Sequence, residues 1–254
     1  MMSASALEER EESLRNPKAN VLGEMFRLSS LRFPNRPAVI FEGREFTYRE
    51  MNARINRVAN ALLGLGVRKG DRVGIFGHNS NVWLECAWGL ARAGCPGIPI
   101  NFRLVGHEVE YILNFSEATV LFIDQPLLEV IRKVRSNLKV QHIVVMRGDA
   151  PEGMIAYEDF LKDASDEAPD VDVRESDLSY MAQTSGTTGR PKFVMHTHRS
   201  SGEVIRNIAF THDYREDDVD LMGMPVYSSA AFGYDYAPTF WHGGTVIVSP
   251  LPPL

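Results

Sequence analysis

The segment TSGTTGRPK at residues 184–192 combines the residue types that hold phosphate groups in proteins. Its glycines, Gly186 and Gly189, can adopt a positive φ at little cost, so consecutive backbone N–H groups can converge on one anion. Four hydroxyl groups and the ammonium group of Lys192 add donors and positive charge. This combination suits a polyphosphate such as ATP, which usually binds together with Mg²⁺. The residues predicted to bind the nucleotide are Thr184, Ser185, Gly186, Thr187, Thr188, Gly189 and Lys192.

The spacing Gly186-x-x-Gly189-x-x-Lys192 differs from two common phosphate-binding patterns. A Walker-type loop requires G-x-x-x-x-G-K-[ST], and a dinucleotide-binding fold requires G-x-G-x-x-G. Composition alone leaves a solvated hairpin loop open as the alternative, because glycine, serine and threonine are common in turns.

The string TSGTTGRPK resembles the phosphate-binding signature of the acyl-adenylate-forming superfamily, which comprises acyl-CoA synthetases, adenylation domains of peptide synthetases and firefly-type luciferases. Three further segments resemble the family in the same order: FTYREMNARINRVANAL from Phe46, LARAGCPGIPIN from Leu90 and MPVYSSAAFGYDYAPTFWHGG from Met224. The resemblance implies an α/β fold with repeated strand-helix units around mostly parallel sheets, as in the first half of the large N-terminal domain of these enzymes. It also implies a reaction in which ATP and a small carboxylic acid form an acyl-adenylate before coenzyme A takes the acyl group.

The resemblance further implies roles for individual residues. The loop hydroxyl groups and Lys192 would contact the β and γ phosphates, and Thr188 would also be a Mg²⁺ ligand. Ala230 stands where peptide-synthetase domains hold an amino group with aspartate, so an α-amino acid is not the expected substrate. The neighbouring small and aromatic side chains suit an apolar or cyclic acyl group, although an aromatic run also suits a core. The predicted substrate-binding residues are Tyr227, Ser228, Ala230, Phe232 and Gly233.

The sequence also departs from the family pattern. The family usually has glycine after the motif lysine, whereas this chain has Phe193, so the exit of the loop is bulkier. Acyl-CoA synthetases usually read Pro-Leu-Phe-His where this chain reads Pro225-Val226-Tyr227-Ser228. The family's adenine-binding segment, ribose-binding aspartate and C-terminal lysine have no counterpart here. We therefore expect the N-terminal part of an acyl-CoA synthetase that is inactive alone, with no confidently assigned catalytic residue.

Two other functional classes stay open. One is a non-catalytic remnant that binds a nucleotide or a partner without performing chemistry. The other is a phosphotransferase, which would need a catalytic base and Mg²⁺-binding carboxylates near the loop, and the sequence does not place them.

Length and composition indicate an ordinary globular protein. The chain has 254 residues and a formal net charge of −6, which gives no general attraction to nucleic acid or to anionic membranes. No apolar run is long enough for a transmembrane segment, and the polar, acidic N-terminus lacks the features of a secretory signal. These observations predict a cytoplasmic protein, and they leave a homodimer open. Cys86 and Cys95 read as buried thiols.

The periodicity of apolar residues predicts alternating strands and helices from about residue 37 onward. Thr47 and Glu50 form a capping box for a helix that ends near Gly66, and Ser80 can cap a helix that ends at Gly94. A continuous helix is expected near residues 127–138, a short helix at Tyr157–Leu161, and an aromatic helix from Ser229 to Trp241. The predicted segments are an N-terminal helical lead-in (1–36), a first α/β subdomain (37–150), an acidic surface bridge (151–178) and the phosphate-loop region with the start of a second subdomain (179–254).

The pair His196-x-His198 falls in a predicted strand, where both side chains would point to one face and could bind a metal ion. No further ligand stands at a supporting spacing. We therefore favour a structural role for both histidines.

Overall fold

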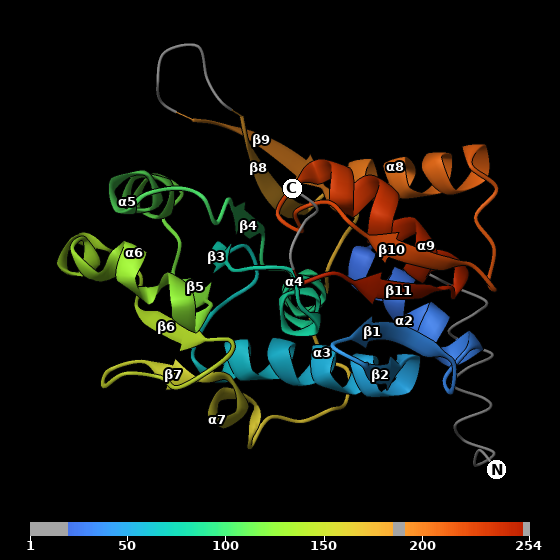
Figure 1. The fold of residues 1–254 in the computed structure, drawn as a ribbon, viewed down its shortest axis with the longest axis horizontal. Helices are drawn as coiled ribbons and strands as arrows, with labels where there is room; N and C mark the ends of the chain where they lie inside the picture. The colour runs from blue at the N-terminus through green and yellow to red at the C-terminus, as the bar shows by residue number, and fades with distance from the viewer. Residues whose placement is uncertain (1–19, 185–190, 251–254) are drawn as a thin grey trace.

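Two β-sheets organise the computed structural model, which describes residues 20–184 and 191–250 (Figure 1). The larger sheet has seven strands in the order β7-β6-β5-β3-β4-β8-β9, and its neighbouring strands are parallel except for β8 and β9. The smaller sheet has the order β10-β11-β1-β2, and only its β1–β2 pair is antiparallel. The predicted α/β class with mostly parallel sheets is confirmed.

The strands of the larger sheet are β3 (Val73–Phe76), β4 (Gly97–Ile100), β5 (Val120–Ile123), β6 (His142–Val145), β7 (Ile155–Ala156), β8 (Leu178–Thr184) and β9 (Lys192–Thr197). Those of the smaller sheet are β1 (Pro37–Phe41), β2 (Arg44–Thr47), β10 (Val219–Met222) and β11 (Thr245–Val248). The α-helices are α2 (Leu22–Arg32), α3 (Tyr48–Gly64), α4 (Asn81–Ala93), α5 (Gly106–Phe115), α6 (Leu128–Arg132), α7 (Tyr157–Leu161), α8 (His198–Thr211) and α9 (Ala237–His242).

Local sequence signals explain where the long helices begin and end. Thr47 Oγ1 accepts a hydrogen bond from the Glu50 N–H at 3.3 Å, and Glu50 Oε2 accepts one from the Thr47 N–H at 2.8 Å, which starts α3 with a capping box. Ser80 caps α4 by accepting from the Trp83 N–H at 3.1 Å, and Gly94 ends that helix with a φ of 69°. These predicted boundaries are confirmed.

Helices α4 and α5 lie on opposite faces of the larger sheet. Helix α4, which follows β3, contributes Trp83, Leu84 and Leu90 to one buried apolar cluster. Helix α5, which follows β4, contributes Val109, Ile112 and Leu113 to a second cluster. The chain therefore leaves the carboxyl ends of β3 and β4 toward opposite faces, which opens a crevice of the kind where α/β sheets bind ligands.

Two predicted helices differ from the observed ones. The segment predicted as one helix over 127–138 is divided into η1 (Gln125–Leu127), α6 and η2 (Arg135–Asn137), in a stretch whose β-branched Val130, Ile131 and Val134 lower helix propensity. The aromatic helix predicted from Ser229 to Trp241 is present but widens into a π-helix, η3 (Ala231–Tyr236), before α9. Pro238 cannot donate the hydrogen bond of a regular α-helix, which favours such a local change.

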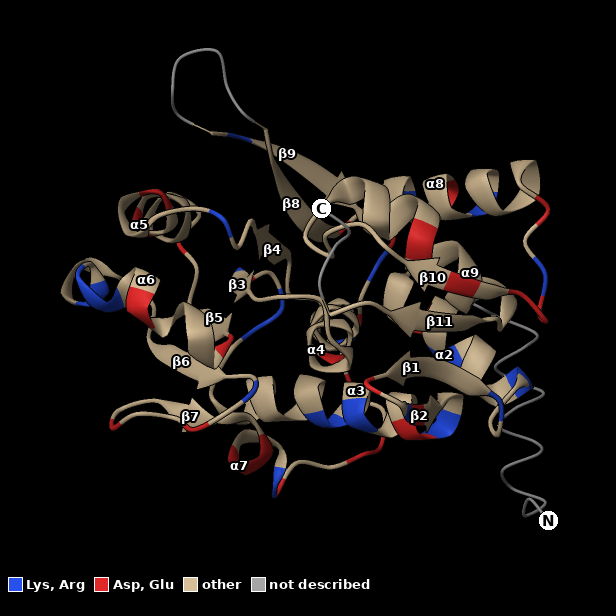
Figure 2. Cartoon of the chain, in the orientation of Figure 1, with Lys and Arg blue, Asp and Glu red and all other residues tan. Residues whose placement is uncertain are grey.

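The acidic segment packs against basic residues of the rest of the chain. Helix α7 forms where the sequence predicted a short helix, and Figure 2 shows its acidic residues beside the basic residues of α3. Further along, Lys69 Nζ lies 2.6 Å from Asp177 Oδ2.

Each sheet combines strands from more than one of the predicted segments. Strand β1 pairs with β11, and β8 pairs with β4. The boundaries after residues 36, 150 and 178 stay predictions.

Cys86 and Cys95 are both buried free thiols, as predicted, and burial raises the pKa of each. Within residues 20–184 and 191–250, no helix combines the length and the apolar character needed to cross a membrane.

Candidate active site

A cavity of about 770 Å³ lies beside the carboxyl ends of β4 and β8. Its first wall comes from the end of β4 and from α5, and its other walls come from the ends of the predicted phosphate loop and from residues 227–229. The lining residues are Pro99, Asn101, Leu104, His107, Glu108, Tyr111, Ile112, Ala182, Gln183, Thr184, Pro191, Tyr227, Ser228 and Ser229. The structure thus brings the flanks of the predicted phosphate loop and the start of the predicted acyl segment to one cavity.

The strand pair β8–β9 positions the two described ends of the phosphate loop. Thr184 is the last residue of β8 and pairs with Lys192, the first residue of β9, and both are exposed. Residues directly opposite each other in an antiparallel pair have side chains on the same face. Thr184 lines the cavity, so its partner Lys192 lies beside the cavity at the end of the hairpin. The predicted contacts of Ser185, Gly186, Thr187, Thr188 and Gly189 lie outside the described residues.

The predicted acyl-binding residues take different positions. Tyr227 and Ser228 line the large cavity and also an adjoining one of about 50 Å³, which Phe232 lines as well. The smaller cavity also has Trp83, Tyr180 and Tyr236 in its wall, and none of its lining residues is charged. Ala230 is exposed and lines neither cavity. Gly233 is buried against α8, where a methyl group added to it would lie 3.4 Å from Ile208 Cδ1.

A buried asparagine holds the segment that carries Tyr227. Asn79, which is 0% exposed, donates from Nδ2 to the Met224 carbonyl at 2.9 Å, and its Oδ1 accepts from the Val226 N–H at 2.8 Å. The sequence analysis missed this residue. Its position could have indicated a role in the site, because Asn79 lies between the end of β3 and the residue that caps α4. Polar residues at such positions lie at the carboxyl edge of the sheet.

A second missed group lies behind Tyr227. Asp124, which follows β5 and is 0% exposed, accepts from Arg147 Nη2 at 2.8 Å and lies 3.1 Å from His78 Nδ1. The His78 ring packs on Phe102 with centroids 4.8 Å apart, and Phe102 contacts Tyr227 edge-on at 5.4 Å. This chain of contacts fixes one wall of the cavity to the core of the sheet.

His196 and His198 do not form the pair considered from the sequence. The strand ends at Thr197, whose Oγ1 accepts from the Ser200 N–H at 3.1 Å and caps α8, so His198 lies in a helix. His198 Nδ1 accepts from the Leu22 N–H at 3.2 Å, whereas His196 stacks on Tyr180 at 4.4 Å. In the part of the chain that the structure describes, no group of three or more His, Cys, Asp or Glu side chains could hold a metal ion.

The burial of His198 predicts a pH-dependent stability. Burial lowers its pKa from 6.5 to about 4, so the unfolded chain binds more protons than the folded one between these pH values. The free energy of unfolding should therefore fall by about 3 kcal/mol from this group as the pH drops from 6.5 to 4. Urea denaturation across this range should show a weaker pH dependence for His198→Asn, which keeps an acceptor without titrating. His107→Gln, at an exposed position, should follow the wild type, and an unchanged slope for His198→Asn would contradict the assignment.

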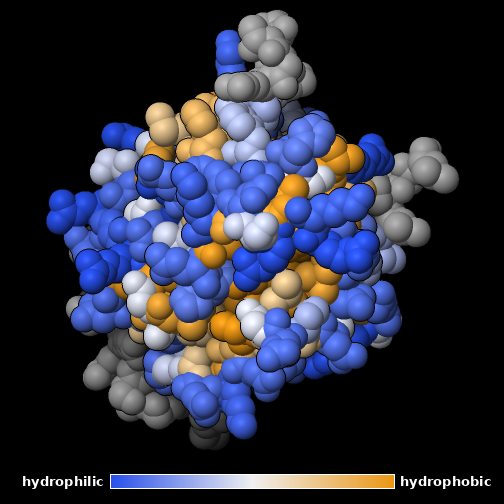
Figure 3. Space-filling model, turned by 90° about the vertical axis from the view of Figure 1, so that its left-hand side faces the viewer, coloured by the Kyte–Doolittle hydropathy of each residue, from blue (hydrophilic) through white to orange (hydrophobic). Residues whose placement is uncertain are grey.

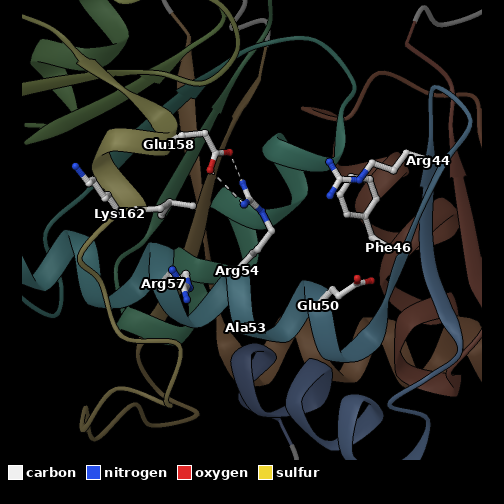
Figure 4. A pocket seen from close by; sticks show the side chains of 9 residues that line it. Arg44, Phe46, Glu50, Ala53, Arg54, Arg57, Glu158 and Lys162 are labelled. Atoms are coloured by element: carbon white, nitrogen blue, oxygen red, sulfur yellow. Dashed lines mark hydrogen bonds and ion pairs between the residues drawn. The ribbon is translucent and has the colours of Figure 1, made fainter.

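A second pocket, of about 300 Å³, lies between α3 and α7 and is lined by several cations (Figure 4). Its central arginine, Arg54, already pairs with Glu158 at 2.7 Å and with the buried Glu85 at 2.7 Å. Arg57 lies 3.4 Å from Asp166. Because carboxylates within the protein balance these charges, the pocket is better explained as an ion-pair network that joins α3 to α7 than as an anion site.

Comparison with known proteins places the chain in a family. The family model described as AMP-binding enzyme matches residues 26–254. The chain is 38% identical over 209 residues to a long-chain-fatty-acid–CoA ligase of Thermus thermophilus, covering 80% of this chain and 38% of that protein. It is 34% identical over 215 residues to a feruloyl-CoA synthase of an Amycolatopsis species, covering 85% of this chain and 41% of that protein.

Solved structures agree. The anthranilate CoA ligase AuaEII in complex with anthranoyl-AMP matches with a TM-score of 0.86 at 27% identity, over 90% of this chain and 45% of that one. The N-terminal domain of FACL13 from Mycobacterium tuberculosis matches with a TM-score of 0.79 at 32% identity, over 91% and 57% of the two chains. This chain spans less than half the length of the two curated relatives. With the signature segment and the fold in place, the family match shows that the chain belongs to the AMP-binding enzymes.

Proposed function

We propose that this chain supplies the phosphate-binding part and one wall of the acyl-binding part of an AMP-forming acid–thiol ligase. In the proposed reaction, ATP and a carboxylic acid form an acyl-adenylate and pyrophosphate, and coenzyme A then takes the acyl group. The observation that carries the proposal is the single cavity lined by Thr184 and Pro191 on one side and by Tyr227 and Ser228 on the other. An adenylating enzyme needs a phosphate group and an acyl group to meet in this way.

The chemistry requires donors near the developing charge. During attack of the carboxylate on the α-phosphate, negative charge grows on the phosphoryl oxygens and on the departing pyrophosphate, so preorganised donors lower the barrier. Thr184 and Lys192 are the described residues that would serve the β and γ phosphates. The proposed Mg²⁺ ligand, Thr188, belongs to the segment that the structure does not describe.

The proposed acid is apolar or cyclic. Tyr227 and Phe232, together with Trp83, offer aromatic surface in the adjoining cavity, and no charged side chain lines that cavity to pair with an amino group. The names of the relatives cover feruloyl, hydroxybenzoate and long-chain fatty acyl ligases, so both aromatic and aliphatic acids belong in a substrate panel. Ala230 and Gly233 stay predicted substrate-binding residues, although neither lines the two cavities.

The proposal assigns the remaining catalytic groups to chain beyond these residues. Parallel sheets normally have both faces covered, yet Val219 and Leu221 of β10 are 62% and 63% exposed on one face of the smaller sheet. The proposal places further protein against this face. A cytoplasmic location and a homodimer remain parts of the prediction.

Calorimetric titration of the 254-residue chain with MgATP tests the nucleotide half of the proposal. We expect saturable binding at one site, together with competition by magnesium pyrophosphate, because in this proposal Thr184 and Lys192 contact the β and γ phosphates. Binding that pyrophosphate does not displace would count against a phosphate site at this cavity. A non-catalytic remnant would also bind MgATP, so catalysis must be tested separately, by pyrophosphate exchange.

A further inference from the structure

A column of stacked aromatic rings joins the exit of the phosphate loop to α5. Tyr111 and Phe115, four residues apart on α5, have ring centroids 5.4 Å apart and planes inclined by 22°. Phe115 in turn stacks on Phe193 of β9, with centroids 5.5 Å apart and planes inclined by 12°. The column therefore runs from the second residue of β9 to Tyr111, which lines the large cavity.

The place of this column in the hairpin gives it a consequence for Lys192. Strand β9 is an edge strand whose one pairing neighbour among the described strands is β8. Successive side chains of a strand point to opposite faces, so Phe193 faces α5 while the side chains of Lys192 and Thr184 share the other face of the hairpin. Holding the Phe193 ring against α5 fixes the rotation of β9 about its own axis. That rotation decides where the Lys192 ammonium group lies relative to Thr184, which lines the cavity.

The column is more than a piece of the core. Phe115 is 62% exposed. Helix α5 lies on the left-hand side of Figure 1, and Figure 3 shows apolar groups among hydrophilic ones on that side of the molecule. A residue that only filled the core would be buried.

We propose that the column of Phe193, Phe115 and Tyr111 is a positioning device that holds Lys192 toward the phosphate groups of bound MgATP. Phe193 and Phe115 act through Lys192 and touch no reacting atom. This inference rests on the proposed function, since it assumes that Lys192 contacts the nucleotide.

Trypsin cleavage after Lys192 tests the anchoring of Phe193 without any need for catalysis. Native-state cleavage follows the population in which the site is locally open. Removing one stacked pair should raise that population by about 2- to 10-fold, so Phe115→Ala should be cut faster by this factor. Phe115→Tyr keeps the ring and should behave as wild type, and so should Met195→Ala, a 65% exposed residue of the same strand outside the column. Equal cleavage of Phe115→Ala and wild type would overturn the proposal.

A double-mutant cycle shows whether the column acts through Lys192. Phe115→Ala should weaken MgATP binding by about 2- to 10-fold in the wild-type background but by less than about 2-fold in Lys192→Ala. Equal losses in both backgrounds would contradict the positioning role. If Lys192→Ala itself had no effect, the proposed phosphate contact would fail, while the cleavage rates would still show whether Phe193 is anchored.

Discussion

Replacing Lys192 with alanine is expected to weaken MgATP binding by about 10- to 100-fold, because a hydrogen bond to a charged group contributes about 1.5–3 kcal/mol. The position of Lys192 in the structure supports this expectation. Lys192 is the register partner of Thr184, which lines the 770 Å³ cavity, at the end of the hairpin. Isothermal titration of wild type and variant with MgATP gives the two dissociation constants directly.

The matched control is Lys162→Ala. Lys162 is also an exposed lysine, but it lines the pocket between α3 and α7, where carboxylates already balance the cations (Figure 4). Its replacement should leave the affinity within about 2-fold of wild type. The opposite pattern, with a large loss for Lys162→Ala and none for Lys192→Ala, would move the nucleotide to the arginine-lined pocket.

Replacing Arg54 with alanine should lower the free energy of unfolding by about 3–5 kcal/mol, because it leaves a buried carboxylate without its cation. The Glu85 side chain is 0% exposed, and burial raises its pKa. Its oxygens accept hydrogen bonds from Arg54 Nε at 2.7 Å, from Tyr157 Oη at 2.8 Å and from Asn81 Nδ2 at 2.8 Å. The two neutral donors alone do not offset the charge. Urea denaturation at pH 7 measures the loss.

Two further variants make this prediction specific. Arg57→Ala breaks a contact with Asp166 in which the Arg57 side chain is 38% exposed and the Asp166 side chain 53% exposed. This change should lower the free energy of unfolding by less than about 1 kcal/mol. Combining Arg54→Ala with Glu85→Gln removes the unpaired charge and should recover part of the loss. An Arg54→Ala variant as stable as Arg57→Ala would show that the buried pair does not hold α3, α4 and α7 together.

Local signals in the sequence predicted much of the fold. The capping box at Thr47 and the glycine at 94 sit within a few residues of the helix ends that they determine, so they can be read without knowing the tertiary structure. The same kind of signal explains one error. Thr197 and Ser200 cap α8, and this cap ends the strand before His198. The prediction that His198 lies in the same strand as His196 is therefore wrong.

Long-range contacts were not predictable in this way. Asn79 holds the segment before Tyr227, and Asp124 pairs with Arg147, but no periodicity marks a residue whose partners lie on other elements. The resemblance named both the loop and the acyl segment, yet it could not show that Thr184 and Tyr227 line one cavity. It also placed Ala230 and Gly233 together, whereas Ala230, just before the π-helix, is exposed and Gly233, within it, is buried.

Carboxylate-dependent exchange of labelled pyrophosphate into ATP tests the central claim most directly. The assay compares the 254-residue chain with a version extended at its C-terminus to the length of its relatives, using short, aromatic, alicyclic and long-chain acids. We predict exchange by the extended protein with an apolar or cyclic acid and none by the 254 residues alone, because effective molarity collapses when positioning groups are absent. Exchange by the shorter chain would show that the catalytic groups are misplaced. Silence of the extended protein with every acid would contradict adenylation and favour a non-catalytic nucleotide-binding protein.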